Sequence, residues 1–483
     1  MYDIFEFLEK SKTAYHAVEN LTLTLKEYGF AELKENEKWN VKKGGKYFVT
    51  RNRSALIAFA VGEKRSFNIV ASHADSPCFK IKASPSMTVE NMVKLNVERY
   101  GGGLNYTFLD RPVTIAGRVV LTDGKTYESK TFTSAKTFVI PSVAIHFNRA
   151  ANDGIKLNPQ TDMSPLVSAL GEKGLEKELK DFAGDKKIID GDLFVVSAEK
   201  PFTAGYNDEL ICSPRIDNLT SAFCSVKGLL SADPQAINVC YAADNEEVGS
   251  QTRQGAGSDF LLSVTKRIAE SLGFDYAAAL ADSIAVSFDN AHAVHPNHPE
   301  FSDPTNKTLL GKGIVVKHHA NFNYTTDALS SSILKGVWET NGVKYQDFYM
   351  RSDLPCGGTL GAVIASSINV HTSYLIAGVF IFAFAVAVLA LSPWKLFREN
   401  SAEREGNLRQ QIRRSVAGGE TLVHTIRAAC CDTYECRADV RCGVFPELRW
   451  LAGASRRYHV LRLSYQRPGG NLRRPGAAEV PVR

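Results

Sequence analysis

Cysteine is sparse in this sequence, and the spacing of the nine that occur disfavours a cysteine-built metal site. No two are separated as Cys-x-x-Cys, even where four of them cluster between residues 430 and 442. The other five are scattered through residues 78–356, mostly in apolar surroundings. That distribution is typical of reduced, buried thiols in a cytosolic protein.

Targeting and low-complexity features are also missing. The first residues, Met-Tyr-Asp-Ile-Phe-Glu, contain neither the basic nor the apolar region of a secretory signal peptide. The 483 residues show no internal repeat, and 44% of them are apolar and 23% charged. Such a composition excludes a wholly disordered chain, a collagen-like fibre and a multi-span membrane protein. We therefore expect a cytoplasmic protein with two or three folded domains.

Lysine nearly disappears from the last part of the chain. Residues 373–483 contain one lysine and 16 arginines, whereas residues 1–372 contain 29 lysines and 11 arginines. The charge balance changes at the same place, from 40 basic against 43 acidic residues to 17 against 9. Folding alone would not produce so abrupt an exchange. We interpret the chain as two sequences of different origin joined near residue 372.

The periodicity of apolar residues predicts an α/β fold. Residues 2–28 have the spacing of an amphipathic helix, and the almost unbroken apolar run at 67–72 is typical of a strand buried on both faces. Further along, helices and strands alternate as in a doubly wound sheet. We therefore predict a discontinuous α/β domain of residues 1–77 and 201–372, interrupted by a β-rich insertion of residues 78–200.

Acidic residues and histidines occur where the expected strands end or helices begin. The carboxyl ends of parallel strands meet at one edge of a sheet, so these groups can converge there. One imidazole and several carboxylates suit a pair of divalent metal ions, above all zinc. Two adjacent glutamates would allow one to bind metal while the other moves a proton. The candidates are His73, Asp75, Asp217, Glu246, Glu247 and Asp289.

Each candidate also has an ordinary structural interpretation. Asp217 precedes an apolar helical run, where an aspartate often caps the helix. His73 could be a hydrogen-bonded histidine at a strand end, and the pair Glu246 and Glu247 could lie in a solvated loop. Only their joint occurrence at element ends favours a metal site, so the residues by themselves leave both interpretations open.

Six strings that carry these residues occur in a fixed order. They are ASHADSP (71–77), YGGG (100–103), RIDNL (215–219), DNEEVGS (244–250), DNAHAVHPN (289–297) and RSDLPCGGTLG (351–361). Together they resemble the aspartyl aminopeptidases, family M18 of the co-catalytic metallopeptidases, over about residues 1–371. The resemblance implies an enzyme with two zinc ions per subunit that releases N-terminal Asp or Glu from peptides. It also implies dimers, formed through the insertion, that assemble into a dodecamer.

The resemblance further implies which residues bind the metal ions. His73 and Asp289 would bind one zinc ion, Asp217 would bridge the two ions, and Glu247 would help to bind the second. Glu246 would act as the general base and acid.

Three other residues receive roles from the same resemblance. Asp75 would orient the metal-binding histidine. His146, in the insertion, would reach the active site of a neighbouring subunit and stabilise the oxyanion there. Lys317 would attract the acidic side chain of the substrate.

The C-terminal part departs from the family. The family continues past Thr372 with a strand and a helix and supplies its last metal-binding histidine there, but this sequence has no histidine between His371 and His424. His371 comes too early to replace it. We therefore expect only Asp217 and Glu247 to bind the second zinc ion, which would impair the peptidase.

The sequence that replaces the family ending begins with an apolar segment. Residues 374–391 are 18 residues without a charge, the threshold length for a transmembrane helix. We expect residues 373–392 to form one hydrophobic helix and residues 393–483 to be an Arg-rich, disordered tail. The positive-inside rule would keep these arginines cytoplasmic and translocate the catalytic part. A frame change or a fused reading frame therefore explains the junction better than a membrane anchor does.

Other function classes were weighed against the peptidase. The tail lacks the aromatic interleaving and finger spacing of nucleic-acid-binding segments, so no nucleic-acid partner is expected. The alternatives to an impaired aminopeptidase are a catalytically inactive truncated or fused product, and a membrane-tethered protein without enzymatic activity.

Overall fold

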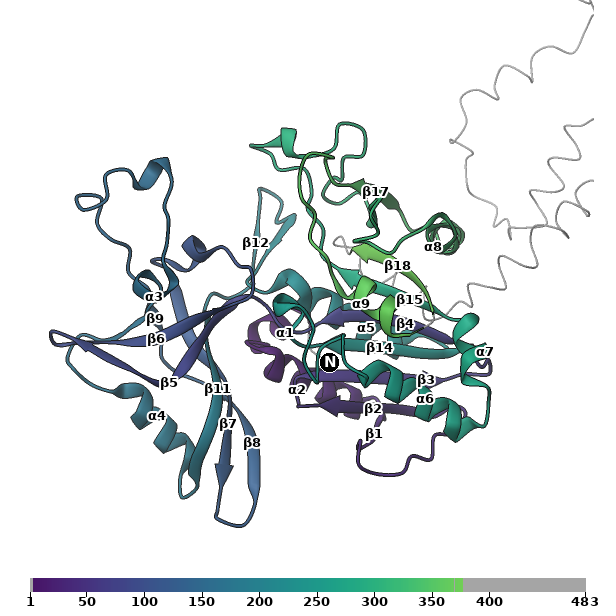
Figure 1. Cartoon of the computed structure of the whole chain (residues 1–483), viewed down its shortest axis with the longest axis horizontal. Helices are drawn as coiled ribbons and strands as arrows, with labels where there is room; N and C mark the ends of the chain where they lie inside the picture. The colour runs from purple at the N-terminus through teal and green to yellow at the C-terminus, as the bar shows by residue number, and fades with distance from the viewer. Residues whose placement is uncertain (1–2, 369, 377–483) are drawn as a thin grey trace, which may run out of the picture. The chain divides into compact units, whose positions relative to one another are not determined.

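The computed structural model describes residues 3–368 and 370–376 (Figure 1). Its α-helices are α1 (Ile4–Lys10), α2 (Ala14–Glu27), α3 (Pro159–Asp162), α4 (Gly174–Ala183), α5 (Ile216–Ser231), α6 (Phe260–Leu272), α7 (Tyr276–Ala281), α8 (Ala328–Thr340) and α9 (Leu360–Ser367). The 3-10 helices are η1 (Asn105–Phe108), η2 (Ala151–Asp153), η3 (Glu246–Val248) and η4 (Pro299–Phe301). None of the helices in the described ranges is both long and apolar enough to cross a lipid bilayer.

From residue 210 to residue 376, strands alternate with these helices. The strands of the described chain are β1 (Ala31–Glu32), β2 (Lys46–Arg51), β3 (Ala55–Val61), β4 (Phe67–His73), β5 (Cys78–Val89), β6 (Met92–Tyr100), β7 (Pro112–Thr122), β8 (Tyr127–Thr133), β9 (Phe138–Val139), β10 (Leu166–Ser168), β11 (Lys187–Ser197), β12 (Phe202–Ala204), β13 (Leu210–Cys212), β14 (Ile237–Ala243), β15 (Ile284–Asp289), β16 (Ile314–His318), β17 (Tyr345–Tyr349) and β18 (His371–Ile376).

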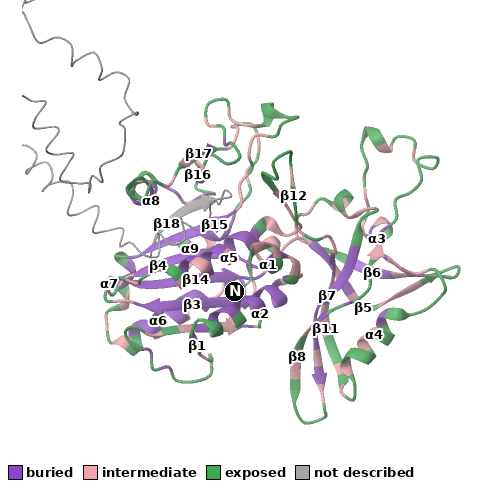
Figure 2. Cartoon of the chain, turned by 180° about the vertical axis from the view of Figure 1, so that it is seen from behind, coloured by how far each residue is buried: buried purple, intermediate pink, exposed green. Residues whose placement is uncertain are grey.

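One sheet of nine strands has the order β1-β2-β3-β14-β4-β15-β18-β16-β17. The central strands β14, β4, β15 and β18 run parallel to one another. Every residue of β3, β4, β14 and β15 is buried, as Figure 2 shows for the middle of this sheet. Strands of this kind need cover on both faces, which explains their almost continuous apolar sequences.

Helices supply that cover on both faces of the nine-stranded sheet. Residues of α1, α2, α5 and α8 pack in one hydrophobic cluster, which includes Leu8, Leu219 and Trp338. Residues of α6, α7 and α9 pack in a second cluster, which includes Phe260 and Ile364. The predicted α/β sheet with helices on both faces is therefore present.

The chain between β4 and β14 forms a second sheet. Its seven strands have the order β11-β5-β6-β10-β9-β7-β8 and lie within residues 78–197 (Figure 1). It has its own hydrophobic cluster, which includes Phe79, Ile115 and Val195. The sequence predicts a β-rich insertion at residues 78–200, and the seven strands of this sheet lie within that range.

The nine-stranded sheet extends beyond residue 372, where the sequence predicts the end of the α/β domain. Residues 373–376, assigned to the apolar segment after the junction, lie in β18 of the nine-stranded sheet. This strand pairs parallel with β15 and antiparallel with β16, so the sheet is continuous between them. The sequence Tyr-Leu-Ile at residues 374–376 suits a strand, because aromatic and β-branched residues pack well in a sheet. The rest of the expected hydrophobic helix and the Arg-rich tail lie outside the described residues.

His16 of α2 connects the first helices to the second sheet. Its Nδ1 lies 2.9 Å from Oγ1 of Thr13, and its Nε2 lies 3.0 Å from Oγ1 of Thr133 in β8. Burial, together with the positive charges of Arg215 and Lys12, lowers the pKa of His16 to about 4. The folded protein therefore keeps this imidazole neutral in mild acid.

We expect this buried histidine to make the protein sensitive to acid. Between pH 6.5 and 4 the unfolded chain takes up a proton that the folded chain refuses, so stability falls as the pH falls through this window. The loss that His16 contributes between pH 7 and pH 5 should be about 2 kcal/mol. Urea unfolding at both pH values should show a smaller loss in His16→Gln than in the native chain. The exposed His295→Gln should lose as much as the native chain; an equal loss in His16→Gln would contradict the prediction.

Candidate metal centre

The predicted site residues meet at one edge of the nine-stranded sheet. His73 is the last residue of β4, and Asp289 is the last residue of β15. Glu246 and Glu247 begin η3, three residues beyond the end of β14. These strands are parallel neighbours, with Ala243 of β14 opposite His73, so their carboxyl ends share one edge.

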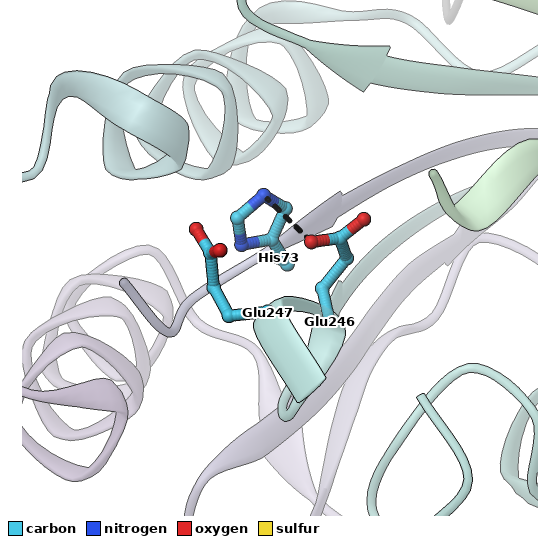
Figure 3. A group of neighbouring side chains, drawn as sticks. All are labelled: His73, Glu246 and Glu247. Atoms are coloured by element: carbon cyan, nitrogen blue, oxygen red, sulfur yellow. Dashed lines mark ion pairs between the residues drawn. The ribbon is translucent and has the colours of Figure 1, made fainter. Parts of the chain in front are cut away.

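His73 lies at the centre of the group. Its Nε2 is 3.4 Å from Oδ1 of Asp217 and 3.7 Å from Oδ1 of Asp289. The same nitrogen is 3.9 Å from Oε2 of Glu246, while Glu247 lies on the other side of the imidazole (Figure 3). Asp217, at the start of α5, is the member most open to solvent, with 60% of its side chain exposed.

Asp75 organises this group without belonging to either set of ligand atoms. Its carboxylate lies 3.4 Å from Nδ1 of His73, and its backbone carbonyl lies 3.1 Å from the same nitrogen. The carboxylate also accepts hydrogen bonds from the backbone N–H groups of Glu246 and Glu247, at 3.1 and 3.2 Å. One buried side chain thus orients the imidazole and fixes the turn that carries both glutamates.

The group has an excess of negative charge, because several carboxylates surround a single imidazole. Burial raises the pKa of Glu246 to about 7 and that of Glu247 to about 8, and the nearby carboxylates add to both shifts. Although burial opposes it, hydrogen bonding to Asp217 and Asp289 raises the pKa of His73 well above its ordinary value. Bound cations would relieve this crowding of negative charge.

The donor set fits divalent metal ions, and zinc in particular. Two groups have ligand atoms within 4.8 Å of one another: His73 with Asp217 and Asp289, and His73 with Glu246 and Glu247. Each group combines an imidazole nitrogen with carboxylate oxygens, which zinc accepts readily. The geometry therefore favours the metal-site interpretation over the isolated structural roles of these residues.

The other two predicted residues, Lys317 and His146, lie outside both ligand groups. Lys317 of β16 is buried, with its ammonium 4.9 Å from the ring centroid of Tyr324 and 5.5 Å from that of Phe348. Burial lowers its pKa to about 8, and the charges of Asp289 and Asp217 act in the opposite direction. His146 is exposed in the turn that follows β9, and it belongs to neither ligand group in the described part of its own chain.

Sequence reasoning missed three residues that hold the site together. The hydroxyl of Tyr100 donates to Asp75 at 2.7 Å and accepts a hydrogen bond from Asn245 at 2.9 Å. The hydroxyl of Thr359 donates to Oδ2 of Asp289 at 2.9 Å. All three lie in or beside strings that resemble the family, but nothing in those strings indicates which partner each residue contacts.

Gly101, next to Tyr100, is required by the close approach of Glu247. Its φ is +78°, and a Cβ atom added there would lie 3.0 Å from Cβ of Glu247. Gly102 has nothing within 4 Å of the same position, which makes it a matched control.

We therefore expect Gly101→Ala to displace Glu247 and to weaken metal binding. Side chains rarely adopt this backbone conformation, and the added methyl group pushes on a metal-site residue. Zinc affinity, measured by titration with a chelator, should fall about 10- to 100-fold in Gly101→Ala. Gly102→Ala should bind as the native chain does, and equal affinities in all three proteins would refute this account of Gly101.

A cavity of about 1000 Å³ adjoins the metal centre. Asp75, Asp217, Asp244 and Glu247 line it, together with residues of α2, of the connection that precedes α2, and of the second sheet. A cavity of this size can hold a short peptide against the carboxylates.

Known proteins resemble this chain over most of its length. The family model described as "Aminopeptidase I zinc metalloprotease (M18)" matches residues 7–375. "Probable M18 family aminopeptidase 2" of Clostridium novyi (strain NT) is 41% identical over 389 residues, which cover 77% of this chain and 90% of that protein. "Aspartyl aminopeptidase 1" of Schizosaccharomyces pombe is 34% identical over 413 residues, which cover 77% and 87%.

Solved structures share the fold. "Cryo-EM structure of the Ape4 and Nbr1 complex" contains a chain with 31% identity and a TM-score of 0.76, and the match covers 83% of this chain and 86% of that one. An M18 aminopeptidase of Thermotoga maritima has 22% identity and a TM-score of 0.72 over 80% and 94% of the two chains, which shows the fold alone. The match of the family model over most of the chain, together with these relatives, shows that this protein belongs to the M18 family of zinc aminopeptidases.

Proposed function

We propose that this protein releases N-terminal aspartate or glutamate from peptides, with two zinc ions in the complete form of its site. The observation that carries this proposal is the convergence of His73 with four carboxylates at the strand ends. Lys317 supplies the only specific support for an acidic first residue. It is a buried cation on β16, in electrostatic contact with Asp289 and Asp217 of the same site.

In this proposal His73 and Asp289 would hold one zinc ion, Asp217 would contribute to both sites and Glu247 would hold the second ion. The ions, when bound, supply Lewis-acid polarisation of the scissile carbonyl and a water of lowered pKa. Glu246 accepts the proton of the attacking water and delivers it to the leaving amine. Its pKa, raised to about 7 by burial, is close to the value that a general base needs at neutral pH.

We further propose that the second zinc site is incomplete in this chain. Ile376, the last described residue of β18, lies opposite Asp289 of β15, at the edge of the sheet where the metal centre lies. Residues 377–391 contain no histidine, cysteine, aspartate or glutamate. His371 begins β18 opposite Ile284, at the other end of the strand pair. Asp217 and Glu247 are then the protein ligands of the second ion.

The test of the function is hydrolysis by the purified, zinc-loaded chain. Peptides that differ only in the first residue, Asp, Glu, Asn or Ala, should be compared by the release of that amino acid. We expect cleavage of the Asp and Glu peptides to exceed cleavage of the Asn and Ala peptides. Faster cleavage of the Ala peptide would overturn the acidic specificity, and no cleavage at two bound zinc ions per chain would favour the inactive alternative.

We also propose a homo-oligomer in which His146 acts in the site of a neighbouring subunit. Its exposure, outside the ligand groups of its own chain, supports this. One solved structure with the same fold and 23% identity is titled "Structure of S. cerevesiae mApe1 dodecamer". The cytoplasmic location expected from the sequence stays a prediction.

Complementation tests the role of His146. Chains with His146→Ala and chains with Glu246→Gln should each be inactive, because each lacks one catalytic group at every site. Mixed and allowed to exchange subunits, they should regain up to about a quarter of the native activity, because some sites then combine an intact His146 with an intact Glu246. Activity of the mixture that stays at the level of the separate variants would refute action between subunits.

A further inference from the structure

The cavity beside the metal centre has a positively charged end as well as an acidic one. Lys12, in the connection between α1 and α2, and Arg215, the residue before α5, both line it. We call these two residues the cationic end of the cavity. Asp217 and Glu247 line the same cavity, so a single extended ligand can contact both ends.

The hydrogen bonds of Arg215 leave its charge uncompensated. Its two terminal nitrogens donate to the backbone carbonyls of Ser197 and Leu8, each at 3.2 Å. Its Nε is buried and has no hydrogen-bond partner in the described part of the chain. Two neutral carbonyl groups hold the guanidinium in place, and neither of them neutralises it.

The ammonium of Lys12 is also without a carboxylate partner. Within the described ranges, no acidic oxygen lies within 4.0 Å of Lys12 or of Arg215. Glu9, the acid that acts on Lys12, is itself paired with Lys200 at 2.9 Å. Burial and the nearby Arg215 lower the pKa of Lys12 to about 8, as expected for like charges that face each other in a partly dry cavity.

We propose that the cationic end binds a carboxylate of the peptide substrate, downstream of the bond that is cleaved. An anion placed there would relieve the repulsion between the two cations and satisfy donors that the protein leaves open. The carboxylate is either the C-terminus of a short peptide or an acidic side chain that follows the first residue. This inference rests on the proposed function, since it assumes that the amino end of the peptide lies at the metal centre.

The cationic end is separate from the lysine proposed to recognise the first residue. Lys317 does not line the cavity and packs between Tyr324 and Phe348. Lys317 and the cationic end would therefore bind two different carboxylates of one substrate. The cavity volume of about 1000 Å³ lies at the upper end of the range for small-ligand pockets, about 300–1000 Å³, which limits the complete ligand to a few residues.

The test measures binding in the zinc-loaded, full-length Glu246→Gln chain, which should not consume the peptide. The probes are Asp-Ala-Ala, its C-terminal amide, and Asp-Ala-Glu amide, together with two- and four-residue peptides of each kind. We expect at least one free carboxylate, terminal or side chain, to tighten the dissociation constant about 10-fold over its neutral counterpart. Lys12→Met should abolish this gain, and Lys12→Arg should retain it.

Lys34→Met is the matched control, because it removes an equal charge from an exposed lysine that is paired with Glu37, does not line the cavity and is not among the charges that act on Lys12. It should leave the gain unchanged. A gain that persists in Lys12→Met, or no gain for any carboxylate at any length, would overturn the proposal. Substituting Asn for the first Asp reports separately on the proposed function. If Asn and Asp peptides bind equally while the downstream gain depends on Lys12, the acidic specificity fails and the cationic end stands.

Discussion

Replacing Glu246 by glutamine should lower the rate of peptide hydrolysis by about 10²- to 10⁴-fold and leave the zinc content unchanged. The amide keeps the size and most of the shape of the side chain but cannot accept the proton of the attacking water. In the structure the backbone of Glu246 is held by Asp75 at 3.1 Å, so the substitution should not release the turn. The measurement is kcat for an Asp peptide, with zinc per chain determined by elemental analysis on the same sample.

Asp289→Asn is the informative comparison, because it should lower both the rate and the zinc content. Asp289 contacts His73 within the ligand group and accepts a hydrogen bond from Thr359. The value of kcat and the zinc content, measured together, thereby distinguish a metal ligand from a residue that transfers the proton. If Glu246→Gln turned over peptide at the native rate, another residue would have to move the proton. If it lost zinc, its role would be that of a ligand.

Replacing everything after Ile376 with a family-type ending should raise the zinc content from about one to two ions per chain. Such an ending continues β18 into a turn and a helix and carries the missing histidine. Since Ile376 lies opposite Asp289, the new residues would start at the metal edge of the sheet. A second ion contributes several kcal/mol of transition-state stabilisation, so kcat should rise by about 10²-fold or more.

Two further proteins separate the ligand from the rest of the tail. A single histidine in place of Phe384 should recover little, because a ligand binds well only when its backbone and its hydrogen-bonded neighbours hold it in position. A chain that ends at Ile376 should bind as much zinc as the native chain, if the native tail supplies no ligand. Two tightly bound zinc ions in the native 483-residue chain would show that a tail residue completes the site.

The sequence alone placed the candidate metal-site residues at the ends of strands, and its resemblance to a family gave each of them a proposed role. Strands with almost unbroken apolar sequences, such as the one that ends at His73, must be covered on both faces, and this already implies helices on both sides of a sheet. Polar residues directly after such strands lie at the carboxyl edge when the strands are parallel, as His73 and Asp289 do in the structure. These inferences rest on local periodicity, which each segment carries by itself.

Only the tertiary structure decided which residues support and extend the site. Tyr100 contacts Asp75 across 25 positions of sequence, and Arg215 contacts Leu8 across 207, so no local pattern announces either pair. The same holds for β18, because its last four residues belong to the segment 373–392 that the sequence predicts as a hydrophobic helix. Its place between β15 and β16 depends on the open backbone groups of those two neighbours. The periodicity of apolar residues indicates which side of each segment is buried. The contacts of a side chain depend on how distant segments pack together.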